Sequence, residues 1–472
     1  MLGRTVHELA FIKACIVIVQ YPIVPYLSVL IACILGAHLS SSPKPWRSGA
    51  LAVVACMLLE LWFALFIWLP YTQRLKQPAK HPVPSSSAAR RTLFDRCMST
   101  VPDMENYLRM WFLGAELSDI RRENVREFLL WAFFDLDNNS AELNTQNYNA
   151  EVEQFIDRTE NILGWRFQPG RGQAKSLRLT FDVIETRYRS VWWYFILALL
   201  DILTHAVLVY NGFQYYAQPR EKAIFPPRMQ QVFSTRRSPA GNLSYWHRPS
   251  SPRRSHNQPV VFLHGIGIGL WIYVRFLVEI CTKGRDGKGG AAIIALEILP
   301  VSFRLTEPPL AKEVFLRQFK TILDHHGCDE FVLVSHSYGS VLTTHAMRCP
   351  ELQTRIKRAV LIDPVTILLH LPTVAYNFTR RRPKTANEWQ LWYFASTDPG
   401  VAHCLGRYFF WRESAIWADE LSGYMTEPKY ADKGQKRLRE VTVCLSGQDL
   451  IVDSHAVASY LAEVTWADRG AC

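Results

Sequence analysis

The 472-residue chain lacks any Cys-x-x-Cys pair, although it has ten cysteines scattered along its length. This spacing excludes the usual zinc frameworks and the class of small disulfide-rich domains. Acidic residues are also in the minority, with 42 Asp and Glu against 53 Lys and Arg, so the net charge is +11. The basic residues are spread over linkers without interleaved aromatic side chains, which favours an anionic membrane surface over nucleic acid. We therefore expect no metal, no cofactor and no nucleic-acid partner.

Charge is nearly absent from two segments close to the N-terminus. Residues 14–35 carry no charged side chain, and residues 50–69 carry only Glu60. Each segment has about the 20 residues that a helix needs to cross a bilayer. The two segments and the short linker between them predict a transmembrane hairpin within residues 1–75, and hence an integral membrane protein.

A third apolar run covers residues 191–210, but Asp201 and His205 interrupt it. The paired aromatic residues Trp192 and Trp193 at its start suit a membrane interface. A carboxylate facing lipid is costly, however, and that argues against a full span. The sequence leaves open whether this membrane-associated run crosses the bilayer or forms an in-plane or core-packed helix.

The distribution of basic residues predicts the orientation in the membrane. Five Lys or Arg follow the hairpin within residues 71–91, against Lys44 and Arg47 in the hairpin loop. The positive-inside rule then places residues 71–189 in the cytosol, and we expect an endomembrane such as the endoplasmic reticulum. Apolar residues at helical spacing predict that residues 76–224 form a helical region. The part after residue 210 shares the cytosolic side only if the third run does not cross.

Ser337 lies where a strand-like run meets a helix-like run. Residues 331–334 are apolar and mostly β-prone, residues 341–347 have helical character, and the small residues Ser335 and Gly339 flank Ser337 at two positions on either side. This pattern is typical of a nucleophile elbow, because the tight turn has no room for larger side chains at the flanking positions. The usual pattern has Gly where Ser335 stands. Ser337 is the candidate nucleophile.

A second strand-like run, residues 259–263, opens into the glycine-rich segment 264–269. A dinucleotide-binding loop would look similar, but no acidic ribose partner follows a next strand. Further apolar runs predict strands at 290–299, 358–365 and 441–445, and an amphipathic helix at 310–325. Apolar strands that alternate with helices imply a parallel sheet with both faces covered.

These motifs resemble the α/β-hydrolase superfamily over about residues 225–472, and in particular the membrane-anchored α/β-hydrolase-domain proteins of fungi. The resemblance implies an α/β fold with a parallel sheet and a helical lid inserted at residues 365–439. The sequence leaves open whether the last strand of the superfamily's sheet is present. It also implies an oxyanion hole made by the backbone N–H of Tyr338 and that of Ile266 or Gly267. An epoxide hydrolase or dehalogenase is rejected, because those enzymes need Asp where this chain has Ser337.

The acid and the base of a triad are less clear. Asp449 follows the strand after which the superfamily usually places its acid, and it is favoured over Asp363, which follows the preceding strand. After Asp449 the only histidine is His455, on the first turn of a helix predicted at 452–463 and not on a loop after a last strand. His336, beside the nucleophile, is expected to point elsewhere. His455 is therefore only a weak candidate for the base.

The predicted lid is rich in aromatic residues, which form either the ordinary packing of a cap or an apolar roof for an acyl chain. Together with the membrane anchor, it favours a lipid or long-chain ester as the substrate. The main interpretation is a membrane-anchored, esterase- or lipase-like serine hydrolase. The alternative is a catalytically inactive α/β-hydrolase fold that serves as a membrane scaffold or lipid-binding module, because the usual last-strand histidine is not found.

Overall fold

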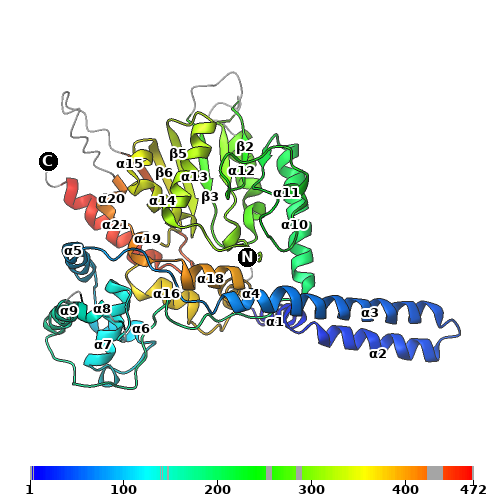
Figure 1. The fold of residues 1–472 in the computed structure, drawn as a ribbon, viewed down its shortest axis with the longest axis horizontal. Helices are drawn as coiled ribbons and strands as arrows, with labels where there is room; N and C mark the ends of the chain where they lie inside the picture. Colours follow the sequence, from blue (N-terminus) through cyan, green and yellow to red (C-terminus); the bar gives the residue numbers. More distant parts are fainter. Residues whose placement is uncertain are drawn as a thin grey trace. The chain divides into compact units, whose positions relative to one another are not determined.

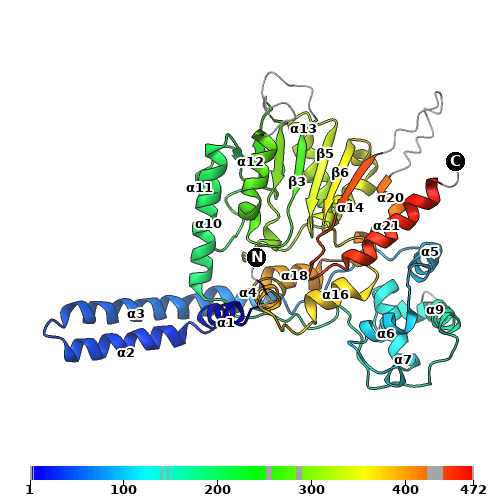
Figure 2. The ribbon, with the colours of Figure 1, turned by 180° about the vertical axis from the view of Figure 1, so that it is seen from behind.

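The computed structural model describes residues 3, 5–138, 140, 142–145, 148–250, 258–282, 290–422 and 439–469, and Figures 1 and 2 show its ribbon. Its strands form one mixed sheet in the order β1-β2-β4-β3-β5-β6-β7. β3 pairs with β4 and β6 with β7 in parallel, whereas β2 pairs with both β1 and β4 antiparallel. The predicted fold, an α/β-hydrolase sheet with helices and apolar N-terminal helices, is confirmed.

The strands agree with the predicted apolar runs, and two more precede them. The bounds are β1 (Gln214–Tyr216), β2 (Tyr245–Arg248), β3 (Val260–Leu263), β4 (Ile293–Leu296), β5 (Phe331–His336), β6 (Ile356–Ile362) and β7 (Glu440–Cys444). β1 and β2 are the two strands that the sequence pattern did not predict. Within the described residues β7 is the last strand, and α21 (Ser454–Arg469) follows it.

The chain forms two compact units. Unit 1 comprises residues 1–77, 184–332 and 382–404, and unit 2 comprises residues 78–183, 333–381 and 405–472. These bounds differ from the predicted segments 1–75, 76–224 and 225–472. The predicted helical region is divided between the units at residue 183, and the lid insertion is divided as well.

The N-terminal helices of unit 1 are α1 (Val6–Gln20), α2 (Ile23–Leu39), α3 (Lys44–Phe63), a π-helical turn (Ala64–Trp68) and α4 (Leu69–Arg74). α2 and α3 lie side by side as a hairpin, visible at one end of Figure 1. α1 and α2 are bent by 83° relative to each other, and Pro22 at the break has no backbone N–H and cannot continue a helix. The apolar run predicted at 14–35 is therefore two helices.

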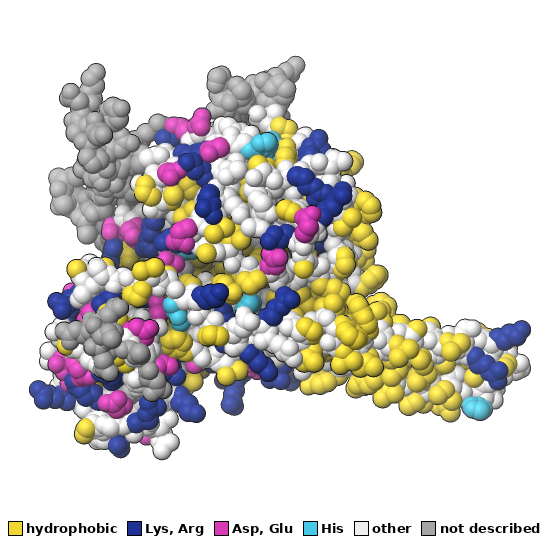
Figure 3. All heavy atoms as spheres, viewed as in Figure 1, with side chains coloured by type: hydrophobic (Ala, Val, Ile, Leu, Met, Phe, Trp, Pro, Cys, Tyr) yellow, Lys and Arg dark blue, Asp and Glu magenta, His cyan; other side chains and the backbone are white. Residues whose placement is uncertain are grey.

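Two helices of the described chain are long and apolar enough to cross a membrane, residues Lys44–Arg74 and Val191–Tyr210. The bent pair of α1 and α2 would add a third only if both together made one span. Figure 3 shows apolar side chains covering the hairpin, with basic side chains at its far end. Lys44 and Arg47 stand in the sequence at that end. These features are compatible with membrane association.

Unit 1 has its core around the fully buried Trp246 and Phe262, and it contains further helices after the N-terminal ones. They are α10 (Val191–Tyr210), α11 (Met229–Phe233), α12 (Val274–Thr282), α13 (Lys312–His325) and α17 (Ala386–Gln390), with 3-10 turns at Gly269–Tyr273 and Leu299–Val301 and a π-helical turn at Leu391–Ser396. α13 agrees with the helix predicted at 310–325. α18 (Pro399–Arg407) begins in unit 1 and ends in unit 2.

Unit 2 contains the elbow helix α14, helices before it and helices after it, in addition to α21. They are α5 (Ser87–Met98), α6 (Met104–Trp111), α7 (Arg122–Leu129), α8 (Glu142–Thr145), α9 (Tyr148–Leu163), α14 (Gly339–Arg348), α15 (Pro350–Gln353), α16 (Pro372–Thr379), α19 (Trp411–Ser414) and α20 (Ala418–Ser422), with a 3-10 turn at Leu117–Asp119 and a π-helical turn at Leu130–Phe134. α5 and α6 begin where the side chains of Ser86 and Asp103 accept backbone N–H groups, the usual N-cap arrangement.

Aromatic residues of the lid insertion contribute to the core of unit 2. The ring of Trp411 lies 5.8 Å from that of Phe133, and its indole N–H donates to the Ala132 carbonyl at 3.0 Å. Trp417 is buried in the same cluster and stacks on His370. These lid residues therefore pack in the helical core of unit 2, and neither interpretation of the lid, a cap on the sheet or a roof for an acyl chain, is tested by these contacts.

Candidate active site

Ser337 occupies a sharp turn between β5 and α14 in unit 2. Its φ is 49°, in the left-handed region that residues with a side chain rarely adopt. The Ser337 N–H donates to the Ile362 carbonyl at the end of β6 (2.9 Å), and the Ser337 carbonyl accepts from the N–H and the hydroxyl of Ser340 (2.9 and 2.7 Å). Backbone contacts on both sides thus hold the turn in its unusual conformation, as a nucleophile elbow requires.

The residues next to Ser337 lie in different surroundings. Ser335 is fully buried in β5, and its hydroxyl has no hydrogen-bond partner in the described chain. Tyr338 is the N-cap of α14, where the helix dipole is positive. The buried ring of Phe409 from the lid insertion lies 6.5 Å from the Tyr338 ring. An aromatic lid residue therefore adjoins the residue next to the candidate nucleophile.

Asp363, the alternative acid, is held at the end of β6 with both carboxylate oxygens engaged. Its φ is 46°, its side chain is buried, and its N–H donates to the Cys444 carbonyl at 2.8 Å. Oδ1 accepts from the Ser446 N–H at 2.6 Å, and Oδ2 accepts from the Ser446 hydroxyl at 2.7 Å. This pairing fixes the loop after β7 to the end of β6, which is a structural arrangement.

Asp449, the favoured acid, has a different pattern of contacts. Oδ1 accepts from the N–H groups of Ile451 and Val452 at 2.6 and 2.8 Å, and the Asp449 N–H donates to the Ser446 carbonyl at 3.2 Å. Oδ2 makes no hydrogen bond among the described residues. One oxygen is therefore fixed by two amides, and the other remains open to a donor such as an imidazole N–H, which is what an orienting acid needs.

The histidine beside the nucleophile faces the acid candidates. Nε2 of His336 lies 4.0 Å from Oδ2 of Asp363. Burial lowers the pKa of the His336 imidazole, and the negative charges of Asp363 and Asp449 oppose this only in part. The imidazole is therefore close to the Asp363 carboxylate, and its pKa is lowered by burial.

His455 stands apart from these groups. It lies on the first turn of α21 and is exposed. Among the described residues its ring makes no hydrogen bond or ion pair with either acid candidate. The prediction that His455 is the general base gains no support from this position.

The predicted oxyanion loop follows β3 in unit 1 and is built around a buried histidine. The Ile298 N–H donates to Nε2 of His264 at 2.8 Å, so the proton of this ring is on Nδ1, which donates to the Gly265 carbonyl at 2.8 Å. The Gly265 N–H donates to the Tyr273 hydroxyl at 3.2 Å. His264 therefore has a structural role, joining the loop to the end of β4.

The structure separates the two candidate donors of this loop. The Gly267 N–H donates to the Val301 carbonyl at 3.1 Å, whereas the Ile266 N–H has no partner among the described residues. Ile266 is thus the better candidate of the two. Because the loop belongs to unit 1 and Ser337 to unit 2, its role toward Ser337 stays a prediction.

Residues 260–470 match the family model described as the alpha/beta hydrolase family. This match to less than half of the chain agrees with the sheet and the elbow, which have the arrangement of an α/β-hydrolase fold, whereas a specific membrane-anchored fungal group is not shown. No curated protein matches the chain.

Solved structures of similar fold include a bacterial membrane phospholipase A described as a virulence factor (13% identity, TM-score 0.33, 57% of this chain and 82% of that one). Naproxen esterase from Bacillus subtilis has 13% identity and a TM-score of 0.33, over 57% of this chain and 86% of that one. Carboxylesterase CesB from the same organism has 14% identity and a TM-score of 0.30, over 57% and 86%. At these values the likeness says nothing about the substrate of this chain.

The sequence analysis missed Ser446. Its backbone and side chain hold both oxygens of Asp363, and its carbonyl accepts from Asp449. A signal existed, since Ser446 and Gly447 form a small turn-forming pair directly after a predicted strand. Nothing in the sequence indicated that this turn would contact the end of the neighbouring strand.

Proposed function

We propose that this protein is a membrane-anchored serine hydrolase that cleaves an acyl ester or a lipid. The observation that carries the proposal is the left-handed backbone of Ser337 between β5 and the N-terminus of α14. A serine in that conformation costs stability, and its place between a strand and the N-terminus of a helix is the arrangement of a nucleophile elbow. The hairpin and the aromatic lid residue beside Tyr338 favour an apolar acyl group.

The chemistry follows from the proposed roles. The Ser337 hydroxyl attacks the ester carbonyl and passes its proton to a histidine, while the carbonyl oxygen becomes an oxyanion. The amide of Tyr338, and that of Ile266 from the oxyanion loop, donate to this oxyanion, which typically contributes about 3 kcal/mol per donor. The tetrahedral intermediate collapses as the histidine returns the proton to the leaving alcohol. Water then hydrolyses the acyl-Ser337 ester by the same steps.

We assign the acid to Asp449, because only one of its oxygens is engaged, and we assign a structural role to Asp363. The proposed base is one of two histidines, His336 or His455, and His336 lies 4.0 Å from Asp363. His336→Gln and His455→Gln variants distinguish them, since the variant that lacks the base loses fluorophosphonate labelling whereas the other retains it.

The test of the function is fluorophosphonate labelling of the full chain in native membranes. Wild type is expected to label and Ser337→Ala is not. Short- and long-chain p-nitrophenyl esters and phosphatidylcholine, assayed in parallel, assign the acyl preference. Equal labelling of wild type and Ser337→Ala refutes the proposal, because no activated serine would then exist at the elbow.

A second function is favoured by the position of His455. If neither His336 nor His455 serves as base, the protein is a catalytically inactive α/β-hydrolase fold acting as a lipid-binding module or scaffold. Its expected signature is no labelling and no turnover, together with binding of a fluorescent fatty acid that persists in Ser337→Ala. Turnover that Ser337→Ala abolishes excludes this second function.

A further inference from the structure

α10 has two faces of different character, although its composition is apolar throughout. The face toward unit 1 is a stripe at helical spacing, buried to less than 9% exposure: Tyr194, Leu197, Asp201, Thr204 and Leu208. The opposite face carries large apolar side chains that are 41–90% exposed: Trp192, Phe195, Ile196, Leu199, Ile202, Leu203, Val209 and Tyr210. A helix with an apolar face this large and exposed needs a partner that covers it.

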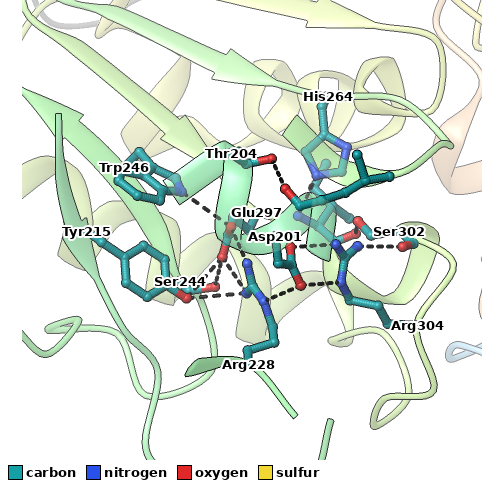
Figure 4. A network of polar contacts seen from close by, with 12 residues as sticks. Asp201, Thr204, Tyr215, Arg228, Ser244, Trp246, His264, Glu297, Ser302 and Arg304 are labelled. Carbon is teal, nitrogen blue, oxygen red and sulfur yellow. Dashed lines mark hydrogen bonds and ion pairs between the residues drawn. The ribbon is translucent and has the colours of Figure 1, made fainter. Parts of the chain in front are cut away.

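The charge within α10 points toward the protein. Oδ1 of Asp201 pairs with Arg304 at 2.6 Å, and its Oδ2 pairs with Arg304 at 3.1 Å and with Arg228 at 3.3 Å (Figure 4). Arg228 also makes two hydrogen bonds to Glu297, at 2.6 and 2.7 Å. The side chains of all four residues are 2–7% exposed. Two carboxylates and two guanidinium groups thus neutralise one another in the core of unit 1.

Glu297 shows that this network is charged and well satisfied. Burial alone would raise the pKa of its carboxyl, but Arg228 and the Ser244 hydroxyl outweigh burial and hold it at about 2. The Tyr215 hydroxyl and the Trp246 indole N–H also donate to Glu297 (Figure 4). α10 is therefore anchored to the sheet by an ion-pair network that a helix surrounded by lipid would not have.

The start of α10 is joined to the predicted membrane hairpin. The Val191 N–H donates to both oxygens of Glu60 in α3, at 3.1 and 3.3 Å, which places a carboxylate at the N-terminus of α10. The rings of Phe63 from α3 and Tyr194 from α10 lie 5.3 Å apart, and Phe225 contacts both. The apolar surfaces of the hairpin and of α10 are therefore continuous at this junction.

Figures 1 and 2 show how the two surfaces run within unit 1. The hairpin of α2 and α3 extends away from the lower end of α10, whereas α10 runs along the side of the sheet. Figure 3 shows apolar side chains along the hairpin and continuing up the side where α10 runs. A bilayer that contains the hairpin would meet the exposed face of α10 along its length.

We propose that α10 lies in the interface of the membrane that the hairpin enters, with its exposed apolar face against the lipids, and that it does not cross the bilayer. The occupant of this face is a phospholipid surface, because the face continues the apolar surface of the hairpin and has aromatic residues at both ends. Residues before and after α10 then share one side of the membrane. This inference does not depend on whether Ser337 is catalytic.

The test measures the depth of α10 in the bilayer. The full chain is reconstituted into phosphatidylcholine liposomes with a fluorescent amino acid at Phe195, Ile202 or Val209, and it is quenched by lipids with a doxyl group near the headgroup or in mid-chain. An in-plane helix gives the same preference for the shallow quencher at all three positions. A spanning helix of 20 residues is about 30 Å long, so Ile202 would prefer the deep quencher and the other two the shallow one.

Two further arms complete the experiment. A probe at Thr321, an exposed position on α13, serves as the solvent control and is expected to be quenched by neither lipid. Glycosylation acceptor sites placed near Val183 and near Glu221, both exposed, are expected to be modified together or not at all. Modification of one site alone overturns the proposal. Absence of quenching at all three positions of α10 also overturns it, because a second copy or another protein would then cover the face.

Discussion

Replacing Ser337 by glycine should make the protein more stable while removing its candidate nucleophile. A residue with a side chain in the left-handed region costs about 1–2 kcal/mol, which glycine avoids. Glycine loses more conformational entropy on folding, worth about 0.5–1 kcal/mol. The backbone hydrogen bonds of residue 337 to Ile362 and Ser340 do not use its side chain, so they remain. The expected net gain over Ser337→Ala is about 0.5–1 kcal/mol.

The assay is thermal unfolding of the full chain in one detergent, with fluorophosphonate labelling in parallel. A gain of 1 kcal/mol raises the midpoint by about 2–4 °C for a cooperative unit of 150–250 residues. Ser337→Gly should unfold at a higher temperature than Ser337→Ala, and neither variant should label. If glycine is more stable than alanine at position 337, the backbone there is strained for any residue that has a side chain.

Ser335 provides the matched control, two positions earlier in the regular strand β5. Ser335→Gly should be less stable than Ser335→Ala by about 0.5–1 kcal/mol, because glycine in a strand interior has only the entropic cost. Ser335→Ala should exceed wild type by about 1 kcal/mol, since it removes a buried hydroxyl without a partner. If Ser337→Gly is no more stable than Ser337→Ala while Ser335 behaves as expected, the elbow is not strained and the functional argument from strain fails.

Three other predictions concern the carboxylates and one buried histidine. Asp449→Asn should lower turnover by about a hundredfold or more at unchanged stability. Asp363→Asn should mainly lower the unfolding free energy, by about 1–3 kcal/mol. The reverse result would exchange the roles of the two carboxylates. Burial lowers the pKa of His370 to about 3. The stability that the neutral, buried imidazole contributes is therefore complete above pH 6.5 and is lost as the pH falls toward 3. Between pH 6 and 5, the unfolding free energy of wild type should fall by about 1 kcal/mol more than that of His370→Gln. Asp201→Asn should cost about 3–5 kcal/mol in thermal unfolding because Arg304 stays buried without its charged partner, and adding Arg304→Met should recover much of this loss; an additive double variant would contradict the pairing.

The alternating strands and the elbow could be predicted because their signals are local. An apolar run of strand length followed by a small-residue turn identifies the segment around Ser337 without knowledge of its partners. β1 and β2 lack such a signal. They have three and four residues, and their place in the sheet depends on antiparallel pairing with each other and with β4, which is more than 40 residues further along the chain than β2.

The candidate acids could be found from the sequence, but their roles could not. Asp363 and Asp449 both follow strands, and the same loop contacts both of them. Which carboxylate has an oxygen left for a histidine depends on where the Ser446 hydroxyl and the Ile451 amide lie, and those positions are set by pairing between β6 and β7. Residue type and spacing carry no information on that point.

The charged residues within apolar runs illustrate the same limit at the membrane. Asp201 counted against a span in the sequence, whereas the run that contains Glu60 was predicted to span, yet each carboxylate has a specific partner in unit 1. Glu60 binds the start of α10, 131 residues later, and Asp201 binds Arg304, 103 residues later. The periodicity of apolar residues shows where a charged residue interrupts a run, but it does not show a partner that lies so far along the chain. In the folded unit each charge marks the face by which an apolar helix contacts the protein.

Energetics also favour an in-plane α10 over a spanning one. To cross the bilayer, α10 would have to place Asp201 in hydrocarbon, at a cost of about 2.5–3.5 kcal/mol on insertion scales. It would also leave Arg304 buried without a charged partner, at a further cost of about 3–5 kcal/mol. Lying in the interface, the helix keeps both ion pairs and still covers its exposed side chains, each of which contributes up to about 1.5–3 kcal/mol when fully removed from water. The in-plane position therefore gains nearly all that spanning offers and loses none of the network around Asp201.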